Sequence, residues 1–417
     1  MLTNKPRVAP HVAELPKSGI RKFFDIVAQS KDVVSLGVGE PDFDTPWHIS
    51  RAAVTCLEDG GTHYTSNLGT PALRQAIARY LERRFGGRFD WTNEILVTVG
   101  VSEAIDLAIR AICSPGDEVL YHEPCFVSYA PTIRLAHAMP VCVETHVEDE
   151  FRLTVDALEA KVTPKTKAIL LNFPCNPTGA TLSRDDMRAI LAFAEKHDLI
   201  VLADEVYSEL NYEGQRVQEG QRSKVKGQTE ELKVPLSDLK PLTSDLISFT
   251  SFPEYRDRVI LLNGFSKSWA MTGYRLGYAC GPNDIIDAMM KIHQYGIMSA
   301  PTLSQAAGVE AMDHGDKDVD RMRREYQRRR DYLVPELNRM GLKTVLPKGA
   351  FYIFSDIRST GLSDEEFALK LLKDFGVACV PGSAFGTCGA GFVRMSYATS
   401  MEKIRLAVER IGKMLSR

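Results

Sequence analysis

The residues best suited to chemistry are a lysine and an arginine that follow an apolar segment. Val259–Leu262 predicts a buried strand, and Asn263 and Gly264 end it shortly before Lys267. Desolvation lowers the pKa of a lysine and favours an amine nucleophile that can form a Schiff base with a carbonyl. Ser266 and Arg275 offer a hydroxyl and a planar cation, which are groups that bind phosphate. Together they indicate a pyridoxal 5'-phosphate site, and a basic surface turn is the alternative.

Length and composition are those of an ordinary globular protein. The 417 residues predict about two domains. Hydrophobic residues make up 44%, charged residues 25%, and the formal net charge is -3, so we expect binding to neither nucleic acid nor membrane. Residues 1–15 are too polar for a signal peptide, and no apolar run is long enough to span a bilayer.

The eight cysteines show no pairing or metal-binding pattern. None forms a C-x-x-C pair, and most lie in apolar segments. Buried free thiols in the cytoplasm are therefore expected. The spacing of a structural zinc site is absent, so we expect no metal.

The middle of the chain alternates apolar segments with helical patterns, which predicts an α/β fold. We expect helices at Ser102–Ile112 and at Ser183–Lys196, the second with a capping box that pairs Ser183 with Asp186. Such alternation predicts a mostly parallel sheet with helices on both faces, which binds ligands beyond the carboxyl ends of its strands. The expected strands are Glu94–Val99, Glu118–Tyr121, Lys167–Leu171, Leu199–Ala203 and Val259–Leu262.

Polar and aromatic side chains follow these strands and would face one crevice. Gly100, Val101 and Ser102 open a helix whose free N–H groups can bind phosphate. Phe126 offers a flat face on which a ring can stack, and Asp204 can pair with a protonated ring nitrogen.

Two further side chains, Tyr207 and Asn176, can donate hydrogen bonds to the phenolate oxygen of pyridoxal phosphate. Plain structural alternatives exist for several of these positions. Asp204 with Glu205 also fits a helix N-cap, Asn176–Gly179 fits a turn, and Phe126 fits a core position. The joint occurrence of these residues in order on successive strand ends favours the cofactor site.

The chain closely resembles the class I/II aminotransferases of pyridoxal-phosphate fold type I over essentially its whole length. The resemblance implies a large domain, residues 49–295, with a mostly parallel seven-stranded sheet between helices. It also implies a smaller α+β domain made of residues 296–417, which the segment 1–48 joins. The motifs that carry the resemblance are Ser35–Phe43, Tyr64–Gly69, Asn176–Gly179, Asp204–Tyr207, Gly264–Lys267, Met271–Gly277, Lys348–Tyr352, Val380–Gly386 and Val393–Ala398.

The resemblance also implies roles for single residues. Lys267 would carry the Schiff base and move a proton at the substrate α carbon, Asp204 would keep the ring nitrogen protonated, and Tyr207 would act on the phenolate oxygen. Tyr64 would reach the phosphate bound by the partner subunit of a homodimer whose active sites lie at the interface. The phosphate ligands within the subunit would be Val101, Ser102, Ser266 and Arg275.

Arg394 is the expected ligand for the substrate α-carboxylate. Its apolar neighbours Val393 and Met395 predict a strand against the core, where an arginine needs a partner. We favour a bound carboxylate, which a guanidinium holds through two hydrogen bonds, over a structural salt bridge. The resemblance places Asn176 and the backbone of Gly39 beside it.

The expected activity is transfer of an amino group from an L-amino acid, aromatic or aspartate-like, to a 2-oxo acid such as 2-oxoglutarate in a ping-pong cycle. A pyridoxal-phosphate lyase of the carbon–sulfur β-lyase type is the alternative on the same fold. A non-catalytic regulator is more remote, because it needs a DNA-binding domain before the motif that begins at Ser35. The segment Ser18–Phe24 resembles members that act on aromatic amino acids. Arg21, Lys22 and Tyr295 are candidates for reading a side-chain carboxylate.

Two segments stand apart from these motifs. Residues 215–245 form a polar insertion of about thirty residues relative to the family pattern, which we expect to be a surface loop, with a lid or a partner-binding element as the alternative. Arg321–Met340 predicts a long helix that Pro335 kinks or interrupts, with its six arginines before Asp331 on a solvated face.

Overall fold

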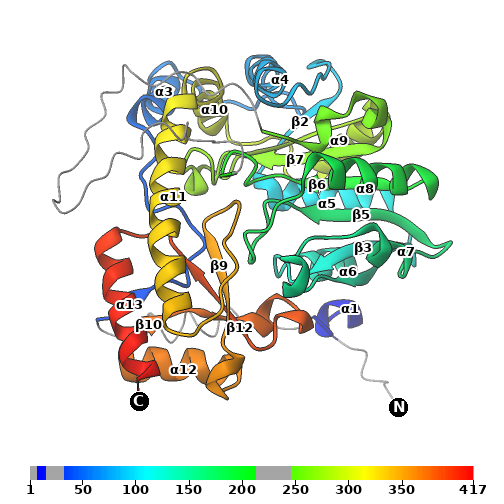
Figure 1. The fold of residues 1–417 in the computed structure, drawn as a ribbon. Helices are drawn as coiled ribbons and strands as arrows, with labels where there is room; N and C mark the ends of the chain where they lie inside the picture. The colour runs from blue at the N-terminus through cyan, green and yellow to red at the C-terminus, as the bar shows by residue number, and fades with distance from the viewer. Residues whose placement is uncertain (1–6, 16–31, 213–245, 417) are drawn as a thin grey trace, which may run out of the picture.

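The computed structural model describes residues 7–15, 32–212 and 246–416 (Figure 1). The insertion expected at 215–245 and the segment Ser18–Phe24, with Arg21 and Lys22, lie outside the described residues.

A seven-stranded sheet forms the centre of the larger part of the molecule. Its strand order is β2-β8-β7-β6-β5-β3-β4, and every strand runs in the same direction except β8, which is antiparallel to both of its neighbours. The mostly parallel sheet expected from the sequence is therefore confirmed. The strands are β2 (Ile95–Thr98), β3 (Glu118–Glu123), β4 (Met139–Glu144), β5 (Thr166–Asn172), β6 (Ile200–Asp204), β7 (Val259–Gly264) and β8 (Gly277–Cys280).

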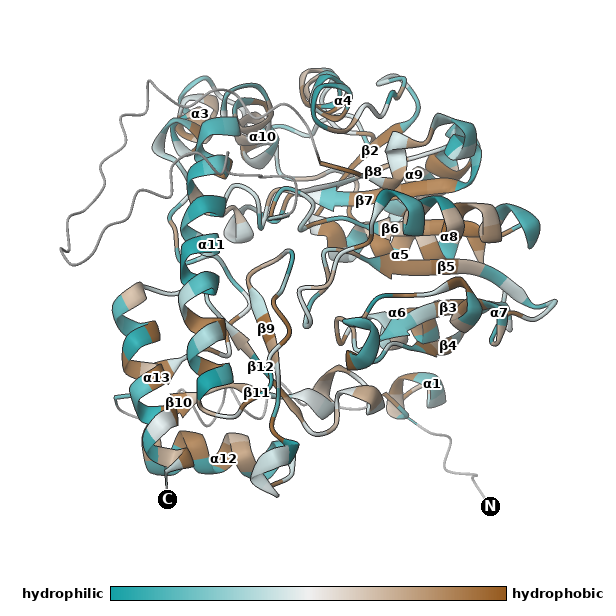
Figure 2. Ribbon diagram, in the orientation of Figure 1, coloured by the Kyte–Doolittle hydropathy of each residue, from teal (hydrophilic) through white to brown (hydrophobic). Residues whose placement is uncertain are grey.

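Helices cover both faces of this sheet, as the continuously buried residues of its central strands require. One face packs against α5 (Gly100–Ile112), α6 (Tyr129–Leu135) and α9 (Asn283–Gly296). The other face packs against α7 (Val155–Glu159) and α8 (Arg184–Lys196). Figure 2 shows hydrophobic residues along the central strands between these layers.

A helical group beside β2 and β8 completes this part. It consists of α3 (Trp47–Glu58), α4 (Pro71–Phe85) and α10 (Thr302–His314), and the buried side chains of α4 and α10 share a core with those of β2 and β8. A short helix, α1 (Pro10–Ala13), contacts α6.

The C-terminal third forms a second core together with residues near the N-terminus. A three-stranded antiparallel sheet contains β11 (Val380–Pro381), β12 (Phe392–Ser396) and β9 (Tyr352–Asp356), and β1 (Val34–Ser35) pairs with β10 (Val377–Ala378). Three helices, α11 (Asp316–Arg339), α12 (Asp364–Phe375) and α13 (Met401–Leu415), pack around these strands (Figure 1). The domain limits implied by the resemblance stay a prediction.

Short 3-10 helices connect these elements. They are η1 (Val147–Asp149), η4 (Phe249–Ser251), η5 (Pro253–Arg258), η6 (Thr272–Tyr274), η7 (Arg358–Thr360), η8 (Gly382–Phe385) and η9 (Thr387–Gly389).

Helices form where the sequence predicted them, and the long helix α11 differs from its prediction at Pro335. The capping box of Ser183 and Asp186 at the start of α8 is confirmed. The predicted interruption of the long helix is wrong, because α11 continues through Pro335. Burial of Val334 and Leu337 against the second core offsets the cost of proline, about 3 kcal/mol.

The solvated arginine face expected on α11 is also wrong in part. Three of its six arginines, Arg323, Arg329 and Arg330, are buried, and each has at least one hydrogen-bond partner. Arg323 pairs with Asp320, while Arg329 pairs with Asp42 and Glu325. Periodicity alone could not show this, because the acceptors of Arg329 include Asp42, which is distant in sequence.

The eight cysteines are all unpaired thiols, and four of them are buried while the others are partly buried. Among the described residues, no helix is both long enough and apolar enough to cross a lipid bilayer.

A buried ion pair ties α4 to the segment that follows β6. The Arg84 guanidinium donates from Nε to Oε1 of Glu209 at 2.8 Å, and the Tyr80 hydroxyl donates to the same carboxylate. The side chains of Arg84 and Glu209 are 8% and 2% exposed, so solvent cannot replace either partner.

Replacing Glu209 by glutamine should strongly destabilise the protein, because it leaves the Arg84 charge buried without a counter-ion. Removing one partner of such a pair costs about 3–5 kcal/mol. Calorimetric thermal unfolding should show a midpoint several degrees lower. Asp313→Asn, which removes the partner of the exposed Arg79, is the control and should cost less than about 1 kcal/mol. Equal shifts in the two variants would contradict the assignment.

Candidate active site

A cavity of about 310 Å³ lies at the carboxyl ends of the parallel strands and collects most of the predicted site residues. Gly100 and Tyr64 of the predicted cofactor site do not line it, and neither does Tyr295, a candidate for reading a side-chain carboxylate. Its lining consists of Gly39, Val101, Ser102, Ile105, Phe126, Tyr129, Asn172, Asn176, Asp204, Val206, Tyr207, Ser266, Lys267, Thr272, Arg275, Tyr352 and Arg394.

Lys267 projects into this cavity from the loop after β7. Its Nζ donates a hydrogen bond to the carbonyl oxygen of Gly39 at 2.7 Å, which joins a segment near the N-terminus to the sheet edge. Burial lowers the pKa of the amine to about 8, with further lowering from Arg394 and Arg275. Near pH 7, the neutral fraction of the Lys267 amine is therefore larger than that of an exposed lysine.

Asp204 is the last residue of β6, the strand next to β7 in the sheet. Its Oδ2 accepts a hydrogen bond from the Tyr129 hydroxyl at 2.6 Å, and its Oδ1 accepts one from the backbone N–H of Val206. Burial raises the pKa of the carboxyl to about 6, and these hydrogen bonds and Lys267 oppose the rise. The group is therefore mostly ionised at neutral pH and faces the cavity as a fixed negative charge.

Asn172 supports this carboxylate from the neighbouring strand. It ends β5 in register with Asp204, and its side-chain nitrogen donates to the Asp204 carbonyl oxygen at 3.0 Å. Its Oδ1 accepts from the backbone N–H of Asn176 at 3.0 Å. One asparagine thus fixes both the end of β6 and the start of the Asn176–Gly179 turn.

Tyr207 and Tyr352 form a hydroxyl pair on another wall of the cavity. Their oxygens lie 2.8 Å apart, and both side chains are buried. Burial raises the pKa of both hydroxyls, so both remain protonated donors at neutral pH. The pair leaves one hydroxyl proton free to be donated to a ligand.

Arg394 lies on β12 and is buried, with 3% of its surface exposed. Its Nη1 donates to Oδ1 of Asn176 at 3.0 Å, and its Nη2 donates to the carbonyl oxygen of Gly37 at 2.6 Å. Its Nε has no hydrogen-bond partner, and no described carboxylate pairs with the guanidinium. The structural salt bridge considered from the sequence therefore does not form among the described residues.

The first turn of α5 and Arg275 form a cationic corner of the cavity. Gly100 has φ +75°, and a Cβ at this position would lie 2.8 Å from Nη2 of Arg275. Glycine is therefore required for the guanidinium to approach the helix N-terminus, where Val101 and Ser102 carry free N–H groups. This arrangement of donors and positive charge fits a phosphate.

Tyr64 lies away from the cavity, as expected of a residue that acts on a partner subunit. Its side chain is 84% exposed, and so is that of Tyr295 at 88%. The segments that carry them are adjacent, because Asn67 donates to the Met298 carbonyl oxygen and Thr302 donates to that of His63.

Three residues that shape the cavity are absent from the sequence predictions, namely Tyr129, Asn172 and Tyr352. Tyr129 follows Phe126 by three residues, so a helical turn would have placed the two on one side. Asn172 is a polar residue directly after an apolar strand, the signal already used for Asp204. Tyr352 lies in the quoted Lys348–Tyr352 motif, but only the three-dimensional packing shows that its hydroxyl meets Tyr207.

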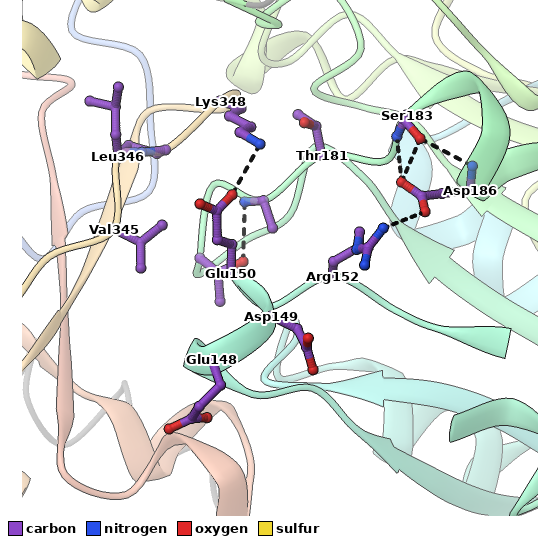
Figure 3. Close-up of a pocket in the computed structure, with 13 residues that line it drawn as sticks. Glu148, Asp149, Glu150, Arg152, Thr181, Ser183, Asp186, Val345, Leu346 and Lys348 are labelled. Atoms are coloured by element: carbon purple, nitrogen blue, oxygen red, sulfur yellow. Dashed lines mark hydrogen bonds and ion pairs between the residues drawn. The ribbon is translucent and has the colours of Figure 1, made fainter. Parts of the chain in front are cut away.

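A second cavity, of about 510 Å³, lies behind the Asn176–Gly179 turn, and none of the predicted site residues lines it (Figure 3). Six of its thirteen lining residues are charged, and four of these form ion pairs with one another. Arg152 pairs with Asp186 at 2.9 Å, and Lys348 pairs with Glu150 at 3.0 Å.

The arrangement in the first cavity can perform a defined set of operations. Lys267 offers a largely desolvated amine that can act as nucleophile and base. Asp204 supplies a fixed negative charge, and the α5 corner supplies an anion site. Arg394 supplies a second anion site, because its buried Nε is free to donate to a ligand.

Comparison with known proteins agrees with this geometry. The family model for aminotransferase class I and II matches residues 31–411. An aspartate aminotransferase of Pyrococcus abyssi is 46% identical over 95% of both chains, and an aromatic-amino-acid aminotransferase of Thermococcus litoralis is 42% identical over 95% of both. An aromatic aminotransferase structure from Pyrococcus horikoshii superposes with a TM-score of 0.83 at 44% identity, covering 94% of this chain and 98% of that one.

These matches cover nearly the full length of the chain, and the family and fold expected from its motifs are confirmed. The chain belongs to the class I and II aminotransferases, a family of enzymes that transfer amino groups.

Proposed function

We propose that this enzyme uses pyridoxal 5'-phosphate, held in the 310 Å³ cavity, to move an amino group between an L-amino acid and a 2-oxo acid. The observation that carries the proposal is the buried Arg394 guanidinium, whose Nε lacks a partner. A buried donor of this kind is costly unless a ligand satisfies it, and a substrate carboxylate can do so.

The residues present fit the cofactor. Asp204 would pair with the protonated ring nitrogen, and Phe126 would lie against the ring face. Tyr207 and Asn176 would donate to the phenolate oxygen. Val101, Ser102, Ser266 and Arg275 would hold the phosphate. When bound, pyridoxal phosphate supplies a ring that withdraws electrons from the substrate α carbon.

Lys267 would act on the proton at the substrate α carbon. Its lowered pKa of about 8 places the amine close to the operating pH of a general base, where proton transfer in both directions is effective. Its Nζ donates to the carbonyl oxygen of Gly39, two residues after the Gly37 carbonyl oxygen that accepts from Arg394. Lys267 would therefore remove the proton from the α carbon of the amino donor in one half of the cycle and return a proton to the α carbon of the acceptor in the other half.

The donor would be an aromatic or aspartate-like amino acid, and the acceptor a 2-oxo acid such as 2-oxoglutarate. The names of relatives support both kinds of donor, since aspartate and aromatic-amino-acid aminotransferases are similarly close. Among the described residues that line the cavity, the cations are Lys267, Arg275 and Arg394. Each already has a role, and the lining is otherwise rich in aromatic rings, which supports an aromatic side chain.

We also propose that two copies of the chain form a homodimer in the cytoplasm. Large apolar side chains are exposed on α3 and around α9 and α10, including Trp47 at 71% and Tyr64 at 84%. Ile297 and Met298 are also exposed, and Met298 accepts a hydrogen bond from Asn67 in the segment that contains Tyr64. Neighbouring exposed apolar groups of this size are typical of a protein interface.

Reduction with borohydride after pyridoxal phosphate is added should fix the cofactor to Lys267, as peptide mass spectrometry would show. Adduct formation should increase as the pH rises through about 8, because the amine is protonated below its pKa and neutral above it. Lys267→Ala should form no such adduct. Lys196→Ala removes an exposed amine and is the control, with unchanged labelling. A midpoint near the ordinary lysine value of 10.5 would contradict the assigned environment.

Replacement of Arg394 by alanine should reduce kcat/KM by about 30- to 5,000-fold, the equivalent of about 2–5 kcal/mol for a buried charge pair. The substitution should impair binding of the substrate, and the amount of bound pyridoxal phosphate, measured by absorbance, should not change. Arg405→Ala removes an exposed arginine and should leave both quantities unchanged. If Arg394→Ala kept its kcat/KM, another group would have to bind the carboxylate.

A panel of amino donors with 2-oxoglutarate tests the reaction itself, with glutamate as the measured product. We expect glutamate from phenylalanine, tyrosine or aspartate. The pocket lining predicts that the aromatic donors have the higher kcat/KM. If no donor yields an amino product, and a sulfur-containing amino acid yields pyruvate instead, the lyase activity would replace the transaminase activity.

A further inference from the structure

Three sulfur and oxygen donors gather where the C-terminal part of the chain meets the edge of the seven-stranded sheet. Glu123 ends β3, Cys142 lies in β4, and Cys388 lies in η9. One donor atom from each side chain lies within 4.8 Å of the other two, and all three side chains are partly buried. None of the three lines the cavity that holds Lys267.

Strand register explains two of these positions. Parallel β3 and β4 pair Tyr121 with Cys142 and Glu123 with Glu144. Residues two apart on a strand point to the same side, so these four side chains project from one face at the sheet edge. Cys388 reaches this face from the C-terminal part of the chain.

Backbone hydrogen bonds hold the C-terminal segment against this face. The N–H of Thr387 donates to Oε2 of Glu123 at 3.0 Å, and the N–H of Cys125 donates to the Phe385 carbonyl oxygen at 3.0 Å. Gly386 has φ +118°, and a Cβ there would lie 2.2 Å from the same Oε2. Only glycine allows the segment to approach the carboxylate so closely.

The Glu123 carboxylate is oriented but not neutralised. Its Oε1 accepts from the Tyr121 hydroxyl at 2.7 Å, and its Oε2 accepts from Thr387. Each oxygen keeps a lone pair after these bonds. No described lysine, arginine or histidine forms an ion pair with Glu123. Hydrogen bonds that orient a ligand in this way are typical of the surroundings of metal sites.

We propose that Glu123, Cys142 and Cys388 bind a divalent metal ion of the Zn²⁺ class. Two thiolates and one carboxylate suit Zn²⁺, whereas Mg²⁺ and Ca²⁺ require oxygen ligands throughout. The two thiol protons pass to solvent as the metal–sulfur bonds form. Water or the exposed Glu144 completes a tetrahedral shell.

The metal would act as a structural link rather than as part of the reaction. It would join β3 and β4 to the segment η8–η9, which contains Phe385. The Phe385 ring lies against the Arg394 guanidinium, with 4.8 Å between the guanidinium carbon and the ring centroid. Metal binding would therefore stabilise the contact that supports one wall of the substrate cavity, whatever substrate is used.

Titration of the full chain with Co²⁺, after treatment with a chelator and in a phosphine reductant, tests this site. The wild type should bind a single ion and develop the visible bands of tetrahedral Co²⁺, which Zn²⁺ then abolishes. Cys142→Ser and Cys388→Ser should each weaken binding by at least about tenfold. Glu123→Gln keeps the shape of the side chain and should weaken it as well.

Cys56→Ser removes a partly buried thiol on α3 and is the matched control, with unchanged Co²⁺ affinity. The proposal is overturned if wild-type binding is no tighter than that of a protein carrying both Cys142→Ser and Cys388→Ser. It is also overturned if the reduced protein binds no metal and air oxidation simply joins Cys142 to Cys388. The thermal midpoint gives a second readout, since Zn²⁺ should raise it in the wild type and in Cys56→Ser only.

Discussion

Burial of opposite charges at the carboxyl edge of one sheet is the constraint on which the site depends. Asp204 and Lys267 follow neighbouring strands, and Arg394 reaches the same cavity from the second core. Desolvation acts against each charge, since it raises the pKa of Asp204 to about 6, lowers that of Lys267 to about 8 and lowers that of Arg394. The proposed cofactor, with its cationic ring nitrogen and its aldehyde, would satisfy Asp204 and Lys267, and a substrate carboxylate beside it would satisfy Arg394.

A few hydrogen bonds between distant parts of the chain keep these charged side chains in place. Arg394 donates to the Gly37 carbonyl oxygen and Lys267 to that of Gly39, so the segment after β1 is attached from both sides. Asn176 connects the same guanidinium to Asn172 and hence to the end of β6. These contacts connect the part of the cavity around Asp204 to the part around Arg394.

The sequence predicted the parts of this arrangement that follow from local pattern. Apolar strands that end in polar residues located Asp204 and Lys267, and a capping box located the start of α8. Contacts between distant segments could not be predicted in this way. The Tyr207–Tyr352 pair, the burial of Arg329 against Asp42 and the continuation of α11 through Pro335 all depend on packing against the second core. The antiparallel β8 also lacks a local signal, because it is a strand of four residues in a glycine-containing segment.

A crystal structure of the protein grown with pyridoxal phosphate and a dicarboxylate such as maleate would show directly which ligands Asp204, Lys267 and Arg394 bind. We expect the cofactor to be joined to Lys267, with Asp204 at its ring nitrogen, its phosphate at the first turn of α5 and a maleate carboxylate on Arg394. Cofactor bound elsewhere, or Arg394 paired with a protein carboxylate while maleate lies away from it, would contradict the proposed site.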